Sequence, residues 1–214
     1  MRSSIVLSAF ACAALALASP ALAQDRTGTV EISPFGGAYF GGDLYDGSLG
    51  RVHAESDFAY GVRFAYNVTR HFGIEVDWTQ ARPNLHTDHY GSPYTSSTIG
   101  QLRHDVYEAN GIFNFGTGRV YGYVGLGAGV SVLKTELNAG PSDSQTKFTG
   151  NISAGMKAFV TPRFGFRLDG RLRSTDTDQT TSHGTSCDYY GYCYHYHSTW
   201  YYSSELTGGL ILAF

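Results

Sequence analysis

Apolar and polar side chains alternate along most of the chain after residue 24. Apolar residues fall at every second position in segments of ten or so residues, and polar or glycine-rich stretches separate these segments. A period of two residues is typical of β-strands, whose side chains point to opposite faces in turn. The pattern predicts eight strands, at 30–40, 58–67, 72–82, 104–115, 120–134, 148–160, 164–174 and 200–214.

The connections between these strands alternate between long and short. They cover 41–57, 68–71, 83–103, 116–119, 135–147, 161–163 and 175–199. Structureless loops of about 20 residues are uncommon in compact soluble domains. Membrane β-barrels, in contrast, have long extracellular loops and short periplasmic turns. We therefore expect an all-β fold, an eight-stranded antiparallel up-and-down transmembrane β-barrel, with both ends of the mature chain on the periplasmic side.

The two faces of the expected strands differ in chemistry. In 164–173, phenylalanine and leucine alternate with arginine and aspartate, so one face suits lipid and the other would line the interior. Eight strands leave an interior that side chains fill, and charges buried there must pair. We expect a charge network made of Arg63, Glu75, Asp77, Glu108, Lys157, Arg167, Asp169, Arg171 and Glu205.

Composition agrees with a membrane barrel and narrows the alternatives. Charged residues make up 15% of the chain, against about 25% in an average protein. The formal net charge of −3 provides no basic surface for a polyanion, so we expect no nucleic-acid partner. A soluble barrel of the lipocalin kind would have the same periodicity with its apolar face turned inward. The alternating loops and the aromatic residues near the strand ends favour the membrane barrel.

The first segment has the features of an export signal. A positive start at Met1-Arg2 precedes an apolar run, and small residues precede Gln24. The run is too short to span a bilayer as a helix. We expect residues 1–23 to be a cleaved signal peptide and residues 24–214 to form one barrel domain.

Three segments resemble the outer-membrane β-barrel domain family. They are 120–130, the hairpin 64–76 and the ending 205–214. That family includes the OmpA transmembrane domain and the OmpX and opacity-protein type barrels. The resemblance implies a bacterial outer-membrane location, with the lipid of that membrane and the barrel-assembly machinery as partners. It also implies that Leu210, Leu212 and Phe214 belong to the signal which that machinery reads.

The resemblance does not imply one activity, because such barrels serve as structural anchors, adhesins, resistance factors and minor pores. One hypothesis is a structural or surface-interaction scaffold whose long loops contact an extracellular protein or another surface ligand. The alternative is a small porin-like transport barrel. We expect neither an enzyme nor a cofactor. His197 and Ser198 are neighbours in a strand pattern, so their side chains would point to opposite faces.

The last loop concentrates cysteine, histidine and tyrosine between 183 and 197. An exported, oxidising location favours a disulfide between Cys187 and Cys193. A metal site with His183, His195 and His197 is the alternative, but such a location does not keep thiolates free, so we expect no metal. A second polar group, His86, Asp88, His89 and His104, flanks another loop, and there we expect solvated side chains.

Overall fold

The computed structural model describes residues 26–47, 50–89, 95–116, 118–137, 143–176, 186–187, 193–194 and 200–214. The expected signal peptide at 1–23 lies outside the described residues and stays a prediction. Within them, no helix has the length and apolar character needed to cross a membrane.

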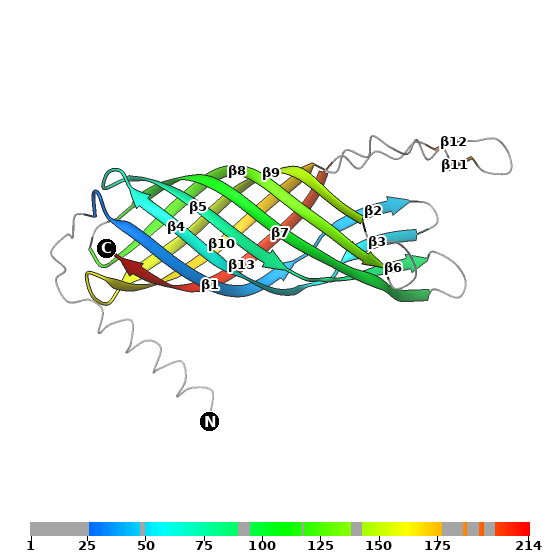
Figure 1. Ribbon diagram of the computed structural model, residues 1–214, viewed down its shortest axis with the longest axis horizontal. Coiled ribbons are helices and arrows are strands. Elements are labelled where there is room, and N and C mark those ends of the chain that lie inside the picture. The colour runs from blue at the N-terminus through cyan, green and yellow to red at the C-terminus, as the bar shows by residue number, and fades with distance from the viewer. Residues whose placement is uncertain are drawn as a thin grey trace, which may run out of the picture.

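Eight long strands form a closed barrel (Figure 1). Each strand pairs antiparallel with two neighbours in the ring order β7-β5-β4-β1-β13-β10-β9-β8, and β8 pairs back with β7. The ring strands are β1 (Val30–Phe40), β4 (Asp57–Asn67), β5 (Phe72–Ala81), β7 (Thr95–Phe115), β8 (Val120–Leu137), β9 (Asp143–Phe159), β10 (Phe164–Asp176) and β13 (Trp200–Ala213). The predicted fold class, an eight-stranded antiparallel barrel, is confirmed.

Three further strands lengthen the wall of the barrel at one end. They are β2 (Asp43–Gly47), β3 (Gly50–Ala54) and β6 (Asn84–His89), and they join the sheet in the order β2-β3-β6-β7. We define the extension as these strands together with 95–103 of β7, 133–137 of β8 and 143–147 of β9. The loops expected at 41–57 and 83–103 are therefore wrong over most of their length, because backbone pairing continues past the apolar alternation.

Short turns lie at the opposite end of the barrel from the extension (Figure 1). They cover 68–71, 116–119 and 160–163, and the C-terminus lies at the same end. In the turn between β7 and β8, Gly116 and Gly118 have φ angles of 104° and 98°. Only glycine adopts such angles without strain, so this tight reversal requires both residues.

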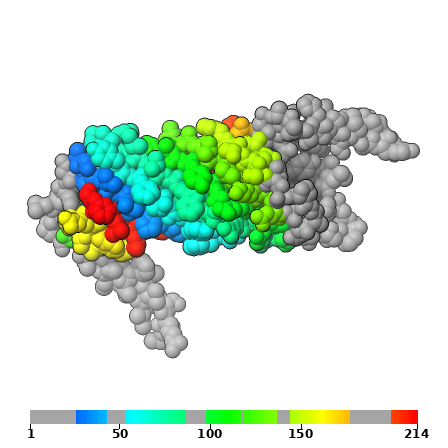
Figure 2. Space-filling model, in the orientation of Figure 1, coloured from blue at the N-terminus to red at the C-terminus, as the bar shows by residue number. Residues whose placement is uncertain are grey.

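The outer wall below the extension is apolar. Its side chains come from every second residue of the ring strands and are half exposed, while their neighbours in sequence are buried. In Figure 2 the strands form a continuous elongated surface. We call this band the belt, and its members include Phe58, Tyr60, Phe64, Ile74, Val76, Tyr107, Phe113, Val124, Leu126, Ile152, Met156, Phe166, Leu168, Leu172, Leu206 and Leu210.

Candidate functional site

Charged side chains fill the middle of the barrel interior. The nine residues expected in the charge network are all buried there. They come from β4, β5, β7, β9, β10 and β13, because alternation along each strand turns every second side chain inward. Charges in such a place are stable only when each has a partner and further hydrogen bonds.

Arg171 is the centre of this network. Its guanidinium lies 2.8 Å from Asp77 Oδ1 and 3.0 Å from Glu108 Oε2 through Nη1. Its Nη2 lies 3.2 Å from Glu75 Oε1. One arginine therefore holds carboxylates from two strands, β5 and β7, against its own strand β10.

A second group surrounds Asp169. Arg63 Nη2 lies 3.1 Å from its Oδ1, and Arg167 Nη2 lies 3.2 Å from its Oδ2. Arg167 also pairs with Glu75 and donates from Nε to the Tyr123 hydroxyl over 2.7 Å, while that hydroxyl donates to Asp169. Because Glu75 contacts both Arg167 and Arg171, the two groups form one continuous network.

Arg173 extends the network toward the extension. Its Nε lies 2.9 Å from Glu108 Oε2, and its Nη1 pairs with Glu205 on β13. Asn110 adds a hydrogen bond of 2.6 Å from Nδ2 to Asp77 Oδ1. The network thus joins strands on opposite sides of the ring.

Lys157 is the one member of the predicted set that pairs elsewhere. Its Nζ lies 2.6 Å from Glu31 Oε2 on β1, and Asn67 Nδ2 donates to the other carboxylate oxygen over 2.8 Å. The sequence interpretation did not include Glu31 in the network. Every second residue of this part of β1 is buried, at Glu31, Ser33 and Phe35. This alternation identifies the inward face of the strand.

A layer of hydrogen-bonded rings lies between the charges and the extension. The Tyr39 hydroxyl is 2.7 Å from that of Tyr201 and 3.1 Å from His104 Nδ1. His104 Nε2 is 2.7 Å from Ser131 Oγ. The expectation that His104 is solvated is wrong, because β7 carries it inward and leaves it 1% exposed.

The interior of the extension is apolar. Ala54, Leu85, Leu102 and Leu133 form a buried cluster with Tyr201, and Ile99 packs against it. The other end of the interior is also closed by an apolar layer, made by Phe159, Ile211 and Ala213 with Tyr121. The charged centre therefore lies between two clusters of buried apolar side chains.

Arg26 completes the layer at the turn end. Its guanidinium carbon lies 3.1 Å from the centroid of the Phe159 ring, and Nη2 is 3.4 Å from the carbonyl oxygen of Pro162. Burial lowers the pKa of this guanidinium, although nearby Tyr121 and Glu31 favour the charged form. The Arg26 side chain therefore lies over the Phe159 ring at this end of the interior.

Glycine makes space for this interior at two places. A Cβ added at Gly155 would lie 2.6 Å from Cζ of Tyr123, the ring that contacts Arg167. A Cβ added at Gly129 would lie 2.7 Å from the Cα of Glu108. Larger residues there would push apart the strands that hold the network.

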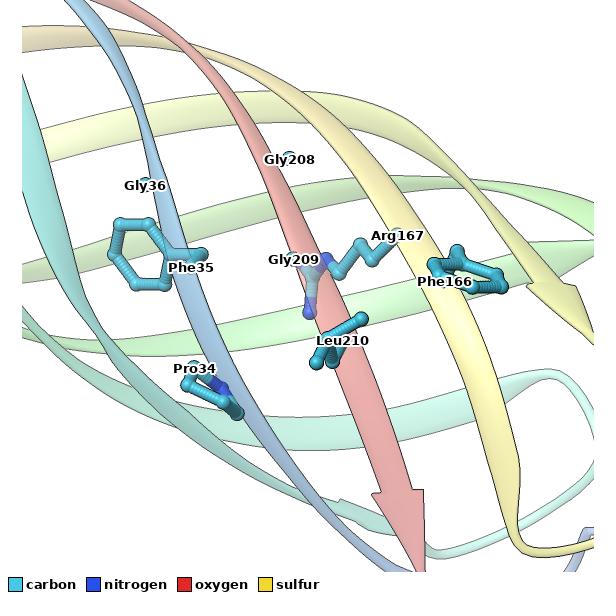
Figure 3. A pocket seen from close by; sticks show the side chains of 8 residues that line it. All are labelled: Pro34, Phe35, Gly36, Phe166, Arg167, Gly208, Gly209 and Leu210. Carbon is cyan, nitrogen blue, oxygen red and sulfur yellow. The ribbon is translucent and has the colours of Figure 1, made fainter.

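A shallow groove of about 540 Å³ lies on the outer wall where β1, β13 and β10 meet (Figure 3). Gly36 and Gly208 form its floor, and Pro34, Phe166 and Leu210 contribute apolar side chains. Phe166 and Leu210 are half exposed members of the belt. The groove therefore opens on the lipid-facing surface, and the buried residues Phe35 and Arg167 also line it.

The remaining predicted site residues lie in two places, between 183 and 197 and at the C-terminal end of the chain. The backbones of β11 (Ser186–Cys187) and β12 (Cys193–Tyr194) pair so that Cys187 is opposite Cys193. The side chains of both cysteines, and all of His183, His195 and His197, lie outside the described part, so the disulfide stays a prediction. Leu210, Leu212 and Phe214 are exposed on the outer face.

The described residues assemble no metal centre. They contain no group of three or more histidine, cysteine, aspartate or glutamate residues that could hold a metal ion. His86 contacts Glu55 at 3.1 Å on the extension, and the side chains of Asp88 and His89 are outside the described part.

Comparison with known proteins identifies relatives of this architecture. Residues 9–190 match the family model of the outer membrane protein β-barrel domain. A comparison with curated proteins gave no match.

Solved structures with the same architecture have low sequence identity. Neisserial surface protein A has a TM-score of 0.56 and 17% identity, with 87% of this chain and 97% of that one covered. For OprG from Pseudomonas aeruginosa the TM-score is 0.60 and the identity 12%, with coverage of 88% and 97%. Ail of Yersinia pestis, solved with the heparin analogue sucrose octasulfate, has a TM-score of 0.51 and 16% identity, with coverage of 88% and 99%. These similarities establish a shared fold.

Proposed function

We propose a structural and surface-interaction role for this chain, which belongs to the outer membrane protein β-barrel domain family and is therefore a protein of the bacterial outer membrane. In this proposal the belt anchors the barrel in lipid, and the extension is its extracellular part, opposite the short periplasmic turns. The observation that carries the proposal is the filled interior. Paired charges occupy the centre, and an apolar layer covers them at each end.

The filled interior argues against the second function, a porin-like transport barrel. Ions crossing it would have to displace the Leu102 cluster and then separate ion pairs that include Arg171. Eight-stranded barrels have little space beyond their own side chains. We therefore expect the purified protein to give no steady open channels in planar lipid bilayers.

Conductance measurements separate the two functions. Steady channels in the wild type whose conductance changes in Arg167→Gln or Glu75→Gln variants would support the transport barrel and overturn the closed scaffold. Leu210→Ala provides a control, because this side chain faces lipid. Recovery of the mature protein in a soluble periplasmic fraction would contradict both functions.

The surface ligand that we propose is an anionic sugar, bound by a local group of three basic residues although the chain as a whole has a net charge of −3. Arg103 lies opposite Lys134 on the outer face of β7 and β8, and Arg82 directly follows Ala81, the last residue of β5, which lies opposite His104. Arg82 and Lys134 are exposed, and Arg103 also contacts Asp105 at 2.7 Å. Clustered guanidinium groups suit sulfate and phosphate.

Sucrose octasulfate is a suitable probe for this surface, given the structure of Ail that contains it. Calorimetric titration of the folded protein should detect binding that an Arg82→Gln, Arg103→Gln, Lys134→Gln variant loses. The matched control neutralises Arg70, Arg119 and Arg163 at the other end. Equal binding by the wild type and the first variant would contradict this assignment.

A further inference from the structure

Each short turn of the barrel carries one exposed arginine. Arg70 lies in the turn between β4 and β5, Arg119 in the turn between β7 and β8, and Arg163 in the turn between β9 and β10. The charged interior does not include them, and neither does the belt. The same positive charge therefore occurs at three equivalent places that belong to neither of these two regions.

The three turns carry no side-chain carboxylate of their own. Their sequences, 68–71, 116–119 and 160–163, contain no aspartate or glutamate. Among the described residues, none of the three guanidinium groups takes part in an ion pair. Exposed His71 lies beside Arg70. The three turns therefore present positive charge, and the C-terminal Phe214 lies at the same end, where Ala213 N donates to the Arg163 carbonyl oxygen over 2.8 Å.

The arginines occupy three of the four alternate gaps around the ring. In the ring order β7-β5-β4-β1-β13-β10-β9-β8, the turns occupy alternate gaps between strands. The fourth alternate gap, between β1 and β13, is next to Arg26, whose side chain is buried against Phe159. The partner of such an arrangement has to surround the barrel and not sit on one side of it.

The depth of the arginines relative to the belt indicates which partner this is. Arg119 and Arg163 each precede the first residue of a strand, Val120 and Phe164, and Arg70 lies two residues before Phe72. Phe72 and Val120 are 45% and 38% exposed on the lipid-facing side. Since a strand residue advances about 3.3 Å, the charges lie within a few ångströms of the apolar boundary. Arginine at this depth lays its stem on apolar surface and extends its guanidinium toward the headgroups.

We propose that Arg70, Arg119 and Arg163 form a basic rim that binds the phosphate groups of anionic phospholipids in the leaflet surrounding this end. Guanidinium groups donate two parallel hydrogen bonds to phosphate oxygens. An acidic protein or polymer beneath the membrane would fit charge alone. A lipid ring fits the charge, the depth and the spacing together, whether or not the interior conducts.

The extension provides a matched control. Among the described side chains, the extension and the strand ends that border it carry the outward basic residues Arg82, Arg103 and Lys134, but carboxylates are mixed among them, at Glu55, Asp57 and Glu136. Neutralising these three residues removes the same number of positive charges from the other end of the molecule. A preference that depends on the rim should survive this change.

The experiment measures lipid selectivity of the folded protein in phosphatidylcholine vesicles. Electron spin resonance gives the association of spin-labelled phosphatidylglycerol relative to spin-labelled phosphatidylcholine. Four proteins are compared: the wild type, an Arg70→Gln, Arg119→Gln, Arg163→Gln variant, the same positions changed to lysine, and the extension control. Heat-modifiable migration in gels verifies that each is folded.

We expect the wild type and the extension control to prefer phosphatidylglycerol by about threefold or more, as cationic groups near a membrane surface attract anionic lipid. The glutamine variant should show a ratio near one, and the lysine variant should keep most of the preference. Salt at about 1 M should weaken the preference in the wild type. Equal ratios in the wild type and the glutamine variant, or an equal loss in the extension control, would overturn the proposal.

Discussion

The part of the barrel that carries the belt, the belt section, belongs to the same sheet as the extension. Apolar side chains face outward in the belt section and inward in the extension. In the belt section, Leu168 faces outward at 51% exposure while its neighbours Arg167 and Asp169 are buried. In the extension, Leu102 is buried at 2% and its neighbours Gln101 and Arg103 face outward. β7 pairs with β8 without a break from Gly100 to Phe115, and this pairing runs through both sections. The contrast shows that a strand face is apolar where it contacts lipid or the packed interior and polar where it contacts water. Backbone pairing is the same in both sections.

The largest effect that we predict is at the centre of the belt section. Arg171→Ala leaves Glu75, Asp77 and Glu108 without their shared partner. Breaking a buried ion pair costs about 3–5 kcal/mol, so the free energy of unfolding should fall by at least that amount. Urea unfolding of the protein folded in lipid vesicles measures it, and a loss below that of an Arg163→Ala control would disprove the role of Arg171.

A pair of identical substitutions compares the two sections directly. Leu102→Ala removes side-chain volume from the buried cluster in the extension and should cost about 2–5 kcal/mol. Leu168→Ala removes the same atoms from a surface that lipid can fill, and its cost should be clearly smaller. Unfolding in the same vesicles tests both. Equal losses would mean that the extension is not a packed, water-facing unit.

A charge on the outer face should be costly in one section only. Leu168→Arg places a guanidinium in the belt, where a charge near the bilayer midplane costs about 2–4 kcal/mol. Reduced stability and a lower folded yield are the expected results. If Leu168→Arg folds as well as the wild type, the belt has been assigned to the wrong face.

The smallest effect is expected for the same charge on the extension. Gln101 is exposed on β7, so Gln101→Arg should change stability by no more than about 0.5 kcal/mol. The midpoint of unfolding should coincide with that of the wild type. A loss comparable with that of Leu168→Arg would place Gln101 in lipid and move the boundary between the sections.

Sequence alternation located the membrane-facing strands well and the extension poorly. It predicted 30–40 and 72–82, where the structure has Val30–Phe40 and Phe72–Ala81. It began β7 at residue 104, whereas the strand begins at Thr95. Outward residues such as Gln101 and Thr98 are polar there, so the apolar alternation that marks a strand in lipid is absent.

The candidate site, too, was predictable from the sequence only in part. Parity along a strand places charges such as Arg167 and Asp169 on one face, and the membrane-barrel interpretation makes that face the inward one. Parity does not say which charges meet across the ring. The contact of Lys157 with Glu31 joins residues 126 positions apart in the chain and depends on the register of several strands. The burial of His104 similarly depends on Tyr39 and Tyr201 from distant strands.

Pairing of the first strand with the last gives the chain an assembly requirement. Glu31 lies opposite Ala213, and Phe40 lies opposite Ser204, so β1 and β13 complete the ring. Until β13 is present, β1 and β10 each have one side of their backbone without hydrogen bonds. Such edges are costly in hydrocarbon and prone to pairing with other chains in water. Closure of the ring therefore has to wait for β13 to be synthesised.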